Sequence, residues 1–468
     1  MTKAVVLGAG ISGLASAALL AQAGYEVTVL ERNSWIGGKS RRIVLNGQRM
    51  DTGPALVTFP EVWQQFLDTY NRLGKARYQD VPEVKFTKLK EVGRYFFRDH
   101  ETVLPVQPGH EWFEPWQRFE REHDALTSSI STLLTAHSLD PRALPAVSKI
   151  VKVYGARLTT ASYIRSLKWM PEGLREVVAI HTLNAGVSPK RTLAIYASIT
   201  AAMTSEGISV PVGGVNELPL TIAELAKRAG ANIKLNERVI GVRKGLVVTD
   251  TDEYPADLIV SSLDPEVLSV LLGRKPRAAR GARSCSGVAI YAVLKKPLPE
   301  STVTHSVVMP DEPAELYQSL EAAVPPRQTM AFVNYYRAGE VYPNEKPTVA
   351  VLLTAPADGK EYDSTSPWVR AELDRISKVM GLDAPIDDYF EAHQILTPKY
   401  FGEWGSALGA LYGKTHPLWQ SGPFHNPQYR SIFRPWLRRV GASVHPGGGI
   451  PAVLGGTLIS LRDLKPKK

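Results

Sequence analysis

A glycine-rich turn near the N-terminus is the feature that most restricts how this chain can fold. Residues 3–7 form a short apolar run, typical of a strand buried in a parallel sheet. Residues 8–13 read GAGISG, the Ala/Leu-rich residues 14–23 predict a helix, and residues 25–30 predict a second strand that ends at Glu31. Because the glycines follow a strand and open a helix, they match the GxGxxG fingerprint of dinucleotide binding in its structural context.

Each glycine of this fingerprint has a physical task. Gly8 permits the tight turn, Gly10 lets a pyrophosphate approach the backbone, and Gly13 allows close packing of helix and strand. The helix N-terminus around Ser12 offers unpaired N–H groups and the positive end of the helix dipole to phosphates. Glu31 falls where a carboxylate can hold both hydroxyls of an adenosine ribose, which argues against a 2′-phosphate and hence against NADP. The alternative is a glycine-rich turn without a ligand, which the matching strands, helix and acid disfavour.

Composition narrows the classes of protein to which the chain can belong. Its 468 residues are more than a single hydrophobic core usually organises, so we expect two domains. Because Cys285 is the single cysteine, the chain can form neither an internal disulfide nor a cysteine-based metal cluster. We expect Cys285 to be an ordinary, partly buried residue, and the protein to lie in a reducing cytoplasm. We find no secretory leader and no apolar run of about 18 residues, so neither secretion nor a membrane span is predicted.

The net charge of +9 suits an acidic partner. No nucleic-acid-binding motif accompanies the charge, so we expect no nucleic acid partner. An anionic membrane surface and a plain solvated basic surface are the remaining interpretations. The oligomeric state is left open.

A second glycine pair follows the strand-end acid. Residues 32–42 read RNSWIGGKSRR, and a Gly-Gly pair here suits a second close approach to a diphosphate, with cationic side chains nearby for its charge. Residues 50–54 read MDTGP and follow a hairpin that we expect to turn at residues 46–47. The candidate binding residues of these segments are Arg32, Gly38, Lys39, Arg41, Gly53 and Pro54.

Two further glycine-rich blocks lie far along the chain. Residues 210–218 read VPVGGVNEL and precede a predicted helix over 219–228 and a strand over 232–235. Residues 440–456 read VGASVHPGGGIPAVLGG, where a strand ends in a glycine-rich turn and a helix is predicted over 451–461.

Together these segments resemble the flavin-dependent amine oxidase and phytoene desaturase superfamily. The block at residues 440–456 narrows the resemblance, because residues 445–451 (HPGGGIP) are similar to the His-Pro-Gly-x-Gly-x-Pro run of bacterial carotenoid desaturases. General amine oxidases carry a Gly-Asp pair in this place. Ala452 and the glycines at 455–456 depart from the commonest phytoene desaturase pattern, which leaves the exact substrate open.

The resemblance implies FAD as a non-covalently bound cofactor. The backbone of Val239 would contact the adenine. The N-terminus of the last helix would stabilise the electron-rich end of the reduced isoalloxazine ring. The residues implied at that end are Gly448, Gly449, Ile450 and Val453.

The implied fold class is α/β: a Rossmann-like FAD-binding domain of the GR2-type flavoprotein kind, with an α+β substrate domain inserted discontinuously. The glycine-rich segments at residues 8–13, 210–218 and 440–456 lie far apart in sequence but must meet on one cofactor, so the chain has to leave the FAD-binding domain and return. We assign residues 1–77, 205–287 and 425–468 to the FAD-binding domain, and residues 78–204 and 288–424 to the substrate domain.

The second substrate segment predicts an antiparallel sheet with helices. Its strand-like runs are residues 288–294, 303–309, 329–336 and 348–355, and residues 368–380 predict a helix.

The resemblance implies desaturation of a hydrophobic carotenoid, either phytoene desaturation or a later step such as 3,4-desaturation. A hydride would leave an allylic carbon for the flavin and a proton would leave the neighbouring carbon; a polyene delocalises the developing cation, so a weak base suffices. His445 is the candidate catalytic residue, although a structural role at the turn is favoured. The alternatives are a flavin-dependent carotenoid or retinoid isomerase or saturase, and a soluble amine or porphyrinogen oxidase on the same fold.

A basic stretch between Asp140 and Glu172 suggests where such a protein could meet a membrane. It contains no acid and six basic residues: Arg142, Lys149, Lys152, Arg157, Arg165 and Lys168. Apolar residues are interleaved, and Tyr154, Tyr163 and Trp169 suit the headgroup level of a bilayer. Because a carotenoid is nearly insoluble in water, we expect a cytoplasmic protein bound peripherally to an anionic membrane surface. The alternative is a helix pair that packs its apolar side inward.

Overall fold

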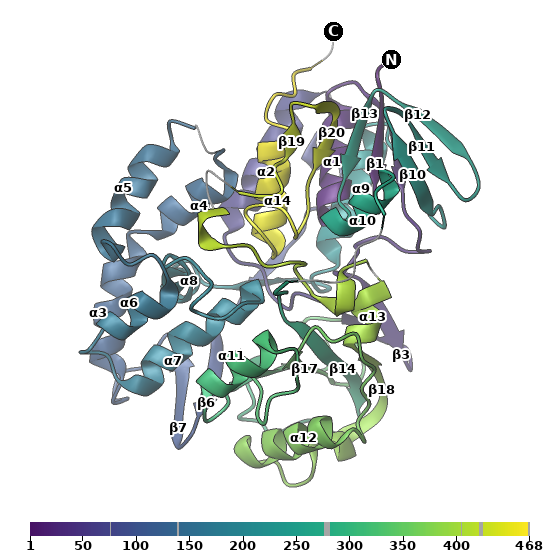
Figure 1. Cartoon of the computed structure of the whole chain (residues 1–468). Coiled ribbons are helices and arrows are strands. Elements are labelled where there is room, and N and C mark those ends of the chain that lie inside the picture. The colour runs from purple at the N-terminus through teal and green to yellow at the C-terminus, as the bar shows by residue number, and fades with distance from the viewer. Residues whose placement is uncertain (75, 138–139, 276–280, 404, 421–424, 467–468) are drawn as a thin grey trace.

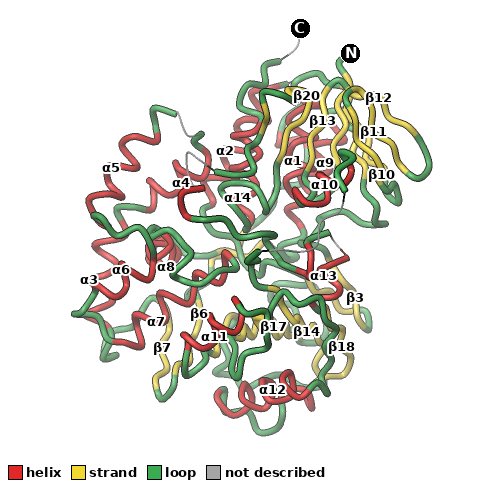
Figure 2. Tube along the Cα trace, in the orientation of Figure 1, coloured by secondary structure: helices red, strands yellow, loops and turns green. Residues whose placement is uncertain are grey.

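The molecule consists of two sheet-based halves and a cluster of helices beside them (Figure 1). The structure is a computed structural model that describes residues 1–468 except 75, 138–139, 276–280, 404, 421–424 and 467–468. Figure 2 shows one group of strands beneath the two termini at the top, a second group in the lower half, and helices gathered at the left.

A six-stranded sheet forms the centre of the upper half. In spatial order its strands are β19 (Arg430–Ser431), β20 (Arg434–Arg439), β13 (Leu258–Ser261), β1 (Lys3–Leu7), β2 (Glu26–Leu30) and β9 (Asn232–Lys234). All neighbouring pairs are parallel except β19 with β20. The sheet therefore joins strands from the N-terminal, middle and C-terminal parts of the chain.

Alternate residues of β1 face two different cores. Ala4 and Val6 pack against a layer of helices, whereas Val5 and Leu7 pack against a small antiparallel sheet on the opposite face. The helices are α1 (Ile11–Gln22), α2 (Pro60–Leu73), α9 (Glu217–Arg228) and α14 (Ile450–Ser460). The small sheet consists of β10 (Val239–Arg243), β11 (Gly245–Thr249) and β12 (Glu253–Ala256), with α10 (Pro265–Leu271) beside it. Burial on both faces explains why β1 reads as a continuous apolar run.

A seven-stranded sheet forms the lower half. In spatial order its strands are β18 (Phe390–Leu396), β14 (Ser286–Leu294), β17 (Thr348–Ala355), β16 (Ala331–Tyr336), β15 (His305–Val308), β6 (Gly93–Phe97) and β7 (His100–Leu104). Helix α12 (Pro367–Val379) covers one face through Leu373 and Ile376. On the other face, Tyr291 packs with Ile43 and Met50 of the hairpin formed by β3 (Arg42–Leu45) and β4 (Gln48–Asp51).

The helical cluster at the left of Figure 1 has its own core, which includes Trp116, Phe119, Leu174 and Val177. Its helices are α3 (Phe113–Asp124), α5 (Ala143–Tyr154), α6 (Thr160–Ser166), α7 (Glu172–Ile180), η2 (His181–Ala185), α8 (Tyr196–Ser205) and α11 (Pro313–Glu321). The neighbouring α4 (Thr127–Thr135) instead places Ile130 in the core of the upper half. The remaining elements are η1 (Tyr78–Asp80), β5 (Phe86–Lys88), β8 (Ser209–Pro211), η3 (Ile386–Tyr389), α13 (Pro398–Glu403), η4 (Ala407–Gly409) and η5 (Leu418–Gln420).

The structure confirms the predicted α/β class and extends it in two places. The hairpin turns at Asn46 and Gly47 with positive φ at both, as a two-residue type I′ turn requires. The sheet expected to be antiparallel contains one parallel pair, β6 with β15, and β6 comes from the first of the two segments assigned to the substrate domain. Within the described residues, no helix has the length and apolar character needed to span a bilayer.

Candidate dinucleotide site

The glycine turn after β1 has the geometry of a phosphate cradle. Gly8 has a φ of +93°, and a Cβ added to Gly13 would lie only 2.0 Å from the carbonyl oxygen of Gly8, so helix α1 approaches the turn closely. At Gly10, by contrast, the nearest atom to an added Cβ is the Cα of Gly38, at 4.0 Å. The space above Gly10 is therefore open, as expected for a position at which a ligand approaches the backbone.

The first turn of α1 supplies donors toward this space. Gly10 is the N-cap of the helix, no side chain caps it, and no acidic residue lies in its first turn, which includes Ser12. The unpaired N–H groups and the positive dipole end can bind an anionic diphosphate.

Glu31 lies at the adjacent strand end and is buried. Its Oε2 accepts a hydrogen bond from the N–H of Ala9 at 2.8 Å, and its Oε1 accepts one from the N–H of Asn33 at 3.0 Å. The N–H of Glu237 donates to the carbonyl oxygen of Glu31 at 2.8 Å, which brings the start of β10, and with it Val239, alongside the strand-end acid. The neighbouring Arg32 is exposed.

The second glycine pair stacks on the first turn. The N–H of Gly37 donates to the carbonyl oxygen of Ala9 at 2.8 Å, and a Cβ added to Gly38 would lie 3.1 Å from the Cα of Gly10. The two glycine segments therefore lie against each other, and the predicted close approach of Gly38 to a diphosphate stays a prediction.

The two cations of this segment are turned toward other partners. The Nζ of Lys39 donates to the carbonyl oxygen of Leu411, and burial lowers the pKa of Lys39 to about 8, opposed by the nearby Asp264. The guanidinium of Arg41 lies 4.6 Å from the centre of the Trp35 ring, and its Nε has no hydrogen-bond partner among the described residues. Their predicted contact with the diphosphate stays a prediction.

A polar network that sequence reasoning missed joins the β3–β4 hairpin to the glycine-rich block at residues 210–218. The Nε of Arg42 donates to Asp51 Oδ1 at 2.9 Å, the N–H of Asn216 donates to Asp51 Oδ2 at 2.9 Å, and Arg42 also pairs with Glu217 at 3.0 Å. Burial raises the pKa of Asp51, whereas the bond from Arg42 opposes the rise. The available signal was the charge pattern: Arg42 and Asp51 face each other across the predicted hairpin.

The predicted residues Gly53 and Pro54 follow Asp51, with Thr52 in between. The N–H of Gly53 donates to the Tyr291 hydroxyl at 3.2 Å, and a Cβ on Gly53 would lie 2.4 Å from the carbonyl oxygen of Lys39. Gly53 therefore lies between the glycine-rich segment and the seven-stranded sheet.

The glycine-rich block at residues 440–456 brings a second helix N-terminus close to the start of α1. A Cβ on Gly441 would lie 3.5 Å from the Oγ of Ser12, and the Oγ1 of Thr457 in α14 donates to the carbonyl oxygen of Ser12 at 3.5 Å. Gly449 is the N-cap of α14, again without a side-chain cap or a first-turn acid. A Cβ on Gly449 would meet no atom within 4 Å, so the start of α14 also faces open space.

The other predicted residues of this block are divided between helix and turn. Ile450 is buried at the first position of α14, and the N–H of Val453 donates to the carbonyl oxygen of Gly449 at 3.0 Å. Gly448 is covered by the ring of Tyr412, whose Cε1 would lie 2.0 Å from an added Cβ.

His445 stacks on another histidine. Its ring centre lies 4.9 Å from that of His425, and burial together with His425 lowers the pKa of His445 to about 4. The imidazole is therefore neutral at pH 7. This stacking supports the structural role, and proton transfer by His445 stays untested.

Asp264 is a further residue that the sequence analysis missed. Its Oδ2 accepts hydrogen bonds from Ser443 at 3.1 Å and Ser406 at 3.3 Å, and its Oδ1 accepts one from the N–H of Glu266 as the N-cap of α10. An Asp before Pro265 at a strand end was the available helix-start signal.

Comparison with known proteins identifies the family. Residues 11–398 match the family of flavin containing amine oxidoreductases. The chain belongs to this family. It is therefore a flavin-dependent oxidoreductase, and FAD is its cofactor; the open glycine turns, the two uncapped helix N-termini and the buried Glu31 fit that group.

Two curated relatives and one solved structure are similar along almost the whole chain. A phytoene dehydrogenase of Streptomyces griseus is 28% identical, over 99% of this chain and 95% of the relative. A 4,4'-diapophytoene desaturase of Staphylococcus aureus is 25% identical, over 99% of this chain and 98% of the relative. The structure of a putrescine oxidase superposes with a TM-score of 0.64 at 14% identity, covering 98% of this chain and 97% of that one, which supports the fold.

Proposed function

We propose that the chain is an FAD-dependent carotenoid desaturase that removes a hydride and a proton across a carbon–carbon bond of an isoprenoid polyene. The observation that carries the proposal is the HPGGGIP turn at the uncapped N-terminus of α14, where carotenoid desaturases differ from general amine oxidases. The full-length similarity to the phytoene dehydrogenase and the diapophytoene desaturase supports it.

The residues of this chain would bind the cofactor, stabilise charge on it and accept a proton. FAD, when bound, supplies the hydride acceptor. The N-terminus of α1 would hold the diphosphate, Glu31 the ribose and Val239 the adenine, while the N-terminus of α14 would stabilise negative charge on the flavin ring. Because a polyene delocalises the developing positive charge, proton removal needs only a weak base, such as the neutral imidazole of His445 or water.

Pigment formation tests the proposed function directly. The chain is expressed in cells that accumulate phytoene or diapophytoene, and the extracted polyene is examined by visible absorption. Desaturation shifts the bands to the red, isomerisation leaves them almost unmoved, and an amine oxidase leaves both precursors unchanged. Gly10→Leu is the matched control, because it should abolish the shift by blocking the diphosphate.

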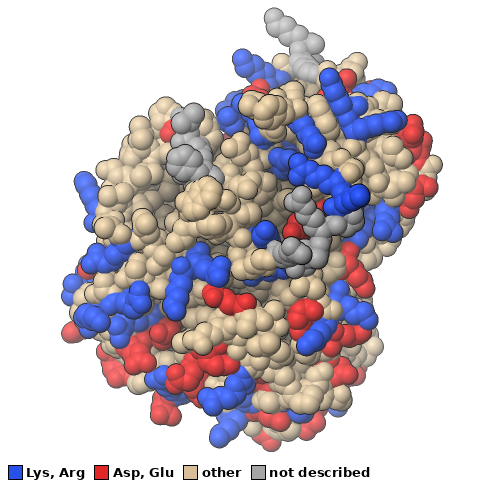
Figure 3. Space-filling view, in the orientation of Figure 1, with Lys and Arg blue, Asp and Glu red and all other residues tan. Residues whose placement is uncertain are grey.

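We further propose peripheral binding to an anionic membrane, through a surface different in detail from the one expected. Four apolar side chains on α5 and the loop after it are exposed: Leu144 (74%), Val147 (44%), Val151 (55%) and Leu158 (70%). Lys149, Lys152 and Arg157 beside them are exposed as well. Figure 3 shows a mostly uncharged surface over α4 and α5. An apolar helix face flanked by cations suits a bilayer with anionic headgroups.

The expected aromatic anchors at the headgroup level are corrected by the structure. Tyr154 and Tyr163 are buried and hydrogen-bonded within the helical cluster, and Trp169 is covered by the guanidinium of Arg118 at 4.0 Å. For Tyr154 the sequence pattern was ambiguous because the inward and outward faces of α5 are both largely apolar.

Liposome sedimentation tests this membrane surface. Leu144→Asp with Val151→Asp should lower binding to anionic liposomes strongly, and added salt should release the unaltered protein. Ile240→Asp is a matched control, because Ile240 is equally exposed, at 55%, on β10 of the other half. Loss of binding on Phe433→Asp instead would move the contact to the tip between β19 and β20, where Ile432 and Phe433 are exposed.

We keep the discontinuous domain division as a proposal. The six-stranded sheet draws its strands from the segments assigned to the FAD-binding domain, and the seven-stranded sheet draws its strands from the segments assigned to the substrate domain, except that β14 begins at Ser286, before the assigned boundary. Limited proteolysis that releases one segment while FAD remains bound would test the boundaries.

A further inference from the structure

Strand β20 and the short strand before it are rich in arginine. Four arginines lie within residues 430–439, which contain no acid: Arg430, Arg434, Arg438 and Arg439. The whole segment 425–468 contains one acid, Asp463, against eight Lys and Arg residues. Because β20 lies inside a sheet that is covered on both faces, each of these charges has to reach either a partner or water.

Asp463 neutralises two of these arginines. The Nη2 of Arg438 pairs with Asp463 Oδ2 at 2.8 Å, and the Nη1 of Arg430 pairs with the same oxygen at 3.1 Å. Arg438 also donates to the carbonyl oxygen of Ser460, at the end of α14, at 3.5 Å. The single acid of the segment is thus occupied on the side of the sheet that carries α14.

Arg439 belongs to the opposite face of β20. Leu437 packs in the core shared with α10, whereas Val440 packs in the core shared with α1, and alternate residues of a strand point to the same face. Arg439 therefore lies on the side of α10, away from the helix whose N-terminus would hold the diphosphate of FAD. Its Nη1 donates to the carbonyl oxygen of Gln428 at 3.0 Å, which is its only side-chain hydrogen bond within the described residues.

Two further arginines lie close to Arg439. Arg434 is half-buried at the start of β20. Arg274 is exposed just after α10, whose Leu271 packs against the same core as Leu437. Burial lowers the pKa of Arg439, and the positive charges of Arg434 and Arg274 lower it further. Among the described residues, no carboxylate pairs with any of these three arginines, which form the arginine cluster.

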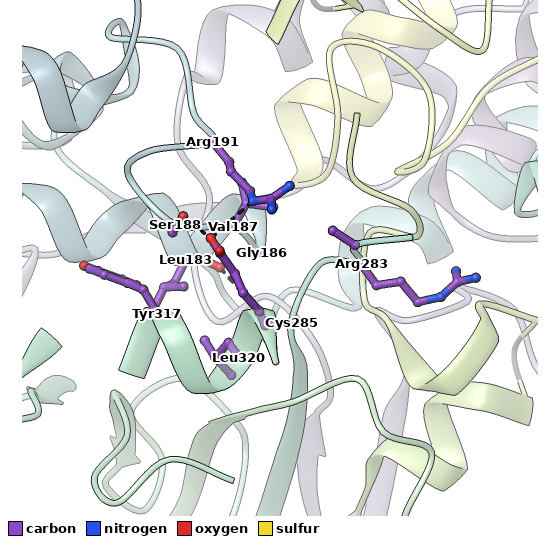
Figure 4. A pocket seen from close by; sticks show the side chains of 11 residues that line it. Leu183, Gly186, Val187, Ser188, Arg191, Arg283, Cys285, Tyr317 and Leu320 are labelled. Carbon is purple, nitrogen blue, oxygen red and sulfur yellow. Dashed lines mark hydrogen bonds and ion pairs between the residues drawn. The ribbon is translucent and has the colours of Figure 1, made fainter. Parts of the chain in front are cut away.

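A neighbouring arginine outside the cluster does have an acidic partner. The Nη1 of Arg283 pairs with Glu266 Oε2 of α10 at 2.9 Å, and in Figure 4 its side chain points away from the small cleft lined by Cys285 and Leu320. Figure 3 shows Lys and Arg side chains gathered on the upper half of the molecule, around β20 and α10. The arginine cluster thus differs from Arg283, Arg430 and Arg438 in that no protein anion balances it.

A phosphate group has the chemistry to balance these charges. Guanidinium groups that lie near one another repel, and an anion between them removes the repulsion. A guanidinium also donates two parallel N–H bonds to phosphate oxygens, which a spherical anion such as chloride cannot match. A phosphate can reach this place on a soluble ligand or on a lipid headgroup, since Phe433, 87% exposed, directly precedes Arg434.

We propose that Arg274, Arg434 and Arg439 form a phosphate-binding site on the face of β20 that is turned toward α10. The site is separate from the glycine turns assigned to FAD, and it does not rest on the desaturase function. Arg439, held by Gln428, supplies the ordered donor, while Arg274 and Arg434 close around the anion from α10 and from the start of β20.

Calorimetric titration of the FAD-loaded protein with inorganic pyrophosphate tests the site, because bound FAD blocks the glycine turns. One equivalent should bind, and Arg439→Gln should weaken binding by about tenfold or more, since charge-assisted hydrogen bonds are lost. Arg439→Lys keeps the charge but not the planar fork, so it should weaken binding as well. Arg274→Gln with Arg434→Gln should have the same effect through two residues that are not buried.

Arg49→Gln with Arg228→Gln is the matched control. It removes the same charge from two exposed positions, on the β3–β4 hairpin and on α9. Binding should stay within about twofold of that of the unaltered protein, because salt screens exposed charges that are far apart. Flavin content and melting temperature are compared for every variant.

Vesicles distinguish the two sources of phosphate. Sedimentation with phosphatidylglycerol vesicles is measured in a protein that also carries Leu144→Asp and Val151→Asp, so that α5 does not contribute. Vesicle binding that needs Arg274 and Arg434, without binding of pyrophosphate, would assign the phosphate to a lipid headgroup. Absence of both kinds of binding, an equal loss in the control, or full affinity in Arg439→Lys would overturn the site and leave a solvated basic surface. Neither outcome bears on pigment formation.

Discussion

Around the six-stranded sheet, important positions are set by main-chain contacts, whereas in the helical cluster they are set by buried side chains. A Cβ on Gly13 would lie 2.0 Å from the Gly8 carbonyl oxygen, and Gly37 bonds to Ala9 through its backbone. In the helical cluster, the buried His123 hydrogen-bonds to Ser198 and Tyr163, both at 2.7 Å, and joins α3, α6 and α8.

This difference explains why the residues around the six-stranded sheet carry a motif and the helical cluster does not. Where two main-chain segments lie in close contact, only glycine fits. Such contacts therefore appear in the sequence as glycines at fixed spacing. A buried side-chain cluster can be assembled from many combinations of residues of suitable size and polarity, and leaves only a burial pattern. Substitutions around the six-stranded sheet and substitutions in the helical cluster should therefore impair the protein in different ways.

The largest expected effect is on cofactor binding at the glycine turn. Gly10→Leu should leave a folded protein without FAD, because Gly10 has an ordinary φ of −73° and open space above it. Gly13→Ala should also lower stability, because its Cβ would collide with the main chain. The flavin-to-protein ratio and thermal unfolding distinguish the two. Full flavin retention in Gly10→Leu would refute the site.

In the helical cluster, His123→Ala should reduce stability and spare the cofactor. The substitution leaves buried hydroxyls without partners and opens a cavity, at a cost of about 3 kcal/mol. Denaturant unfolding measures this cost, and flavin content per folded protein should not change. Tyr163→Phe, which removes only one hydrogen-bonding group, should cost about 1 kcal/mol. Loss of FAD in folded His123→Ala would contradict the view that cofactor binding does not depend on the packing of the helical cluster.

The pH dependence at Lys39 is the next expected effect. The pKa is about 8 in the folded chain and 10.5 unfolded, so the unfolded state binds more protons between these values. Stability of the flavin-free protein should therefore rise from pH 8 to pH 10.5, by at most about 3 kcal/mol. Lys39→Met should lack this rise. Comparing the two proteins removes the contribution of the tyrosines, and parallel curves would show that Lys39 is not buried as described.

The smallest expected effect concerns His445. If its role is structural, His445→Gln should lower desaturation by less than about tenfold, or about 1.4 kcal/mol. Its pKa is about 4 folded and 6.5 unfolded, so the unaltered protein should lose stability as pH falls between these values, and the variant should lose less. A much larger loss of turnover with unchanged stability would make His445 the proton acceptor.

The sequence predicted the flavin-side elements well and the substrate side only in part. Strand β1, helix α9 and helix α14 were expected within a few residues of their observed bounds, because caps and glycines mark their ends. The parallel pairing of β6 with β15 could not be predicted, because pairing partners far apart in sequence leave no local signal.

The candidate site shows the same limit. The turns at Gly10 and Gly38 and the strand-end Glu31 were found by their spacing, but the ion pair of Arg42 with Asp51 and the hydrogen bonds to Asp264 were not. Those contacts depend on side chains brought together by the tertiary fold. The inward direction of Tyr154 and Tyr163 was missed for the same reason.

The strand order of the upper sheet has a consequence for synthesis of the chain. β1 pairs with β13 through Ala4 and Leu258, and β13 pairs with β20 through Ile259 and Leu437, so the sheet is completed only after a strand far along the chain from β1 has left the ribosome. Such high contact order slows folding and leaves strand edges exposed on the nascent chain. Cofactor capture should therefore wait until β20 has been synthesised and has paired with β13.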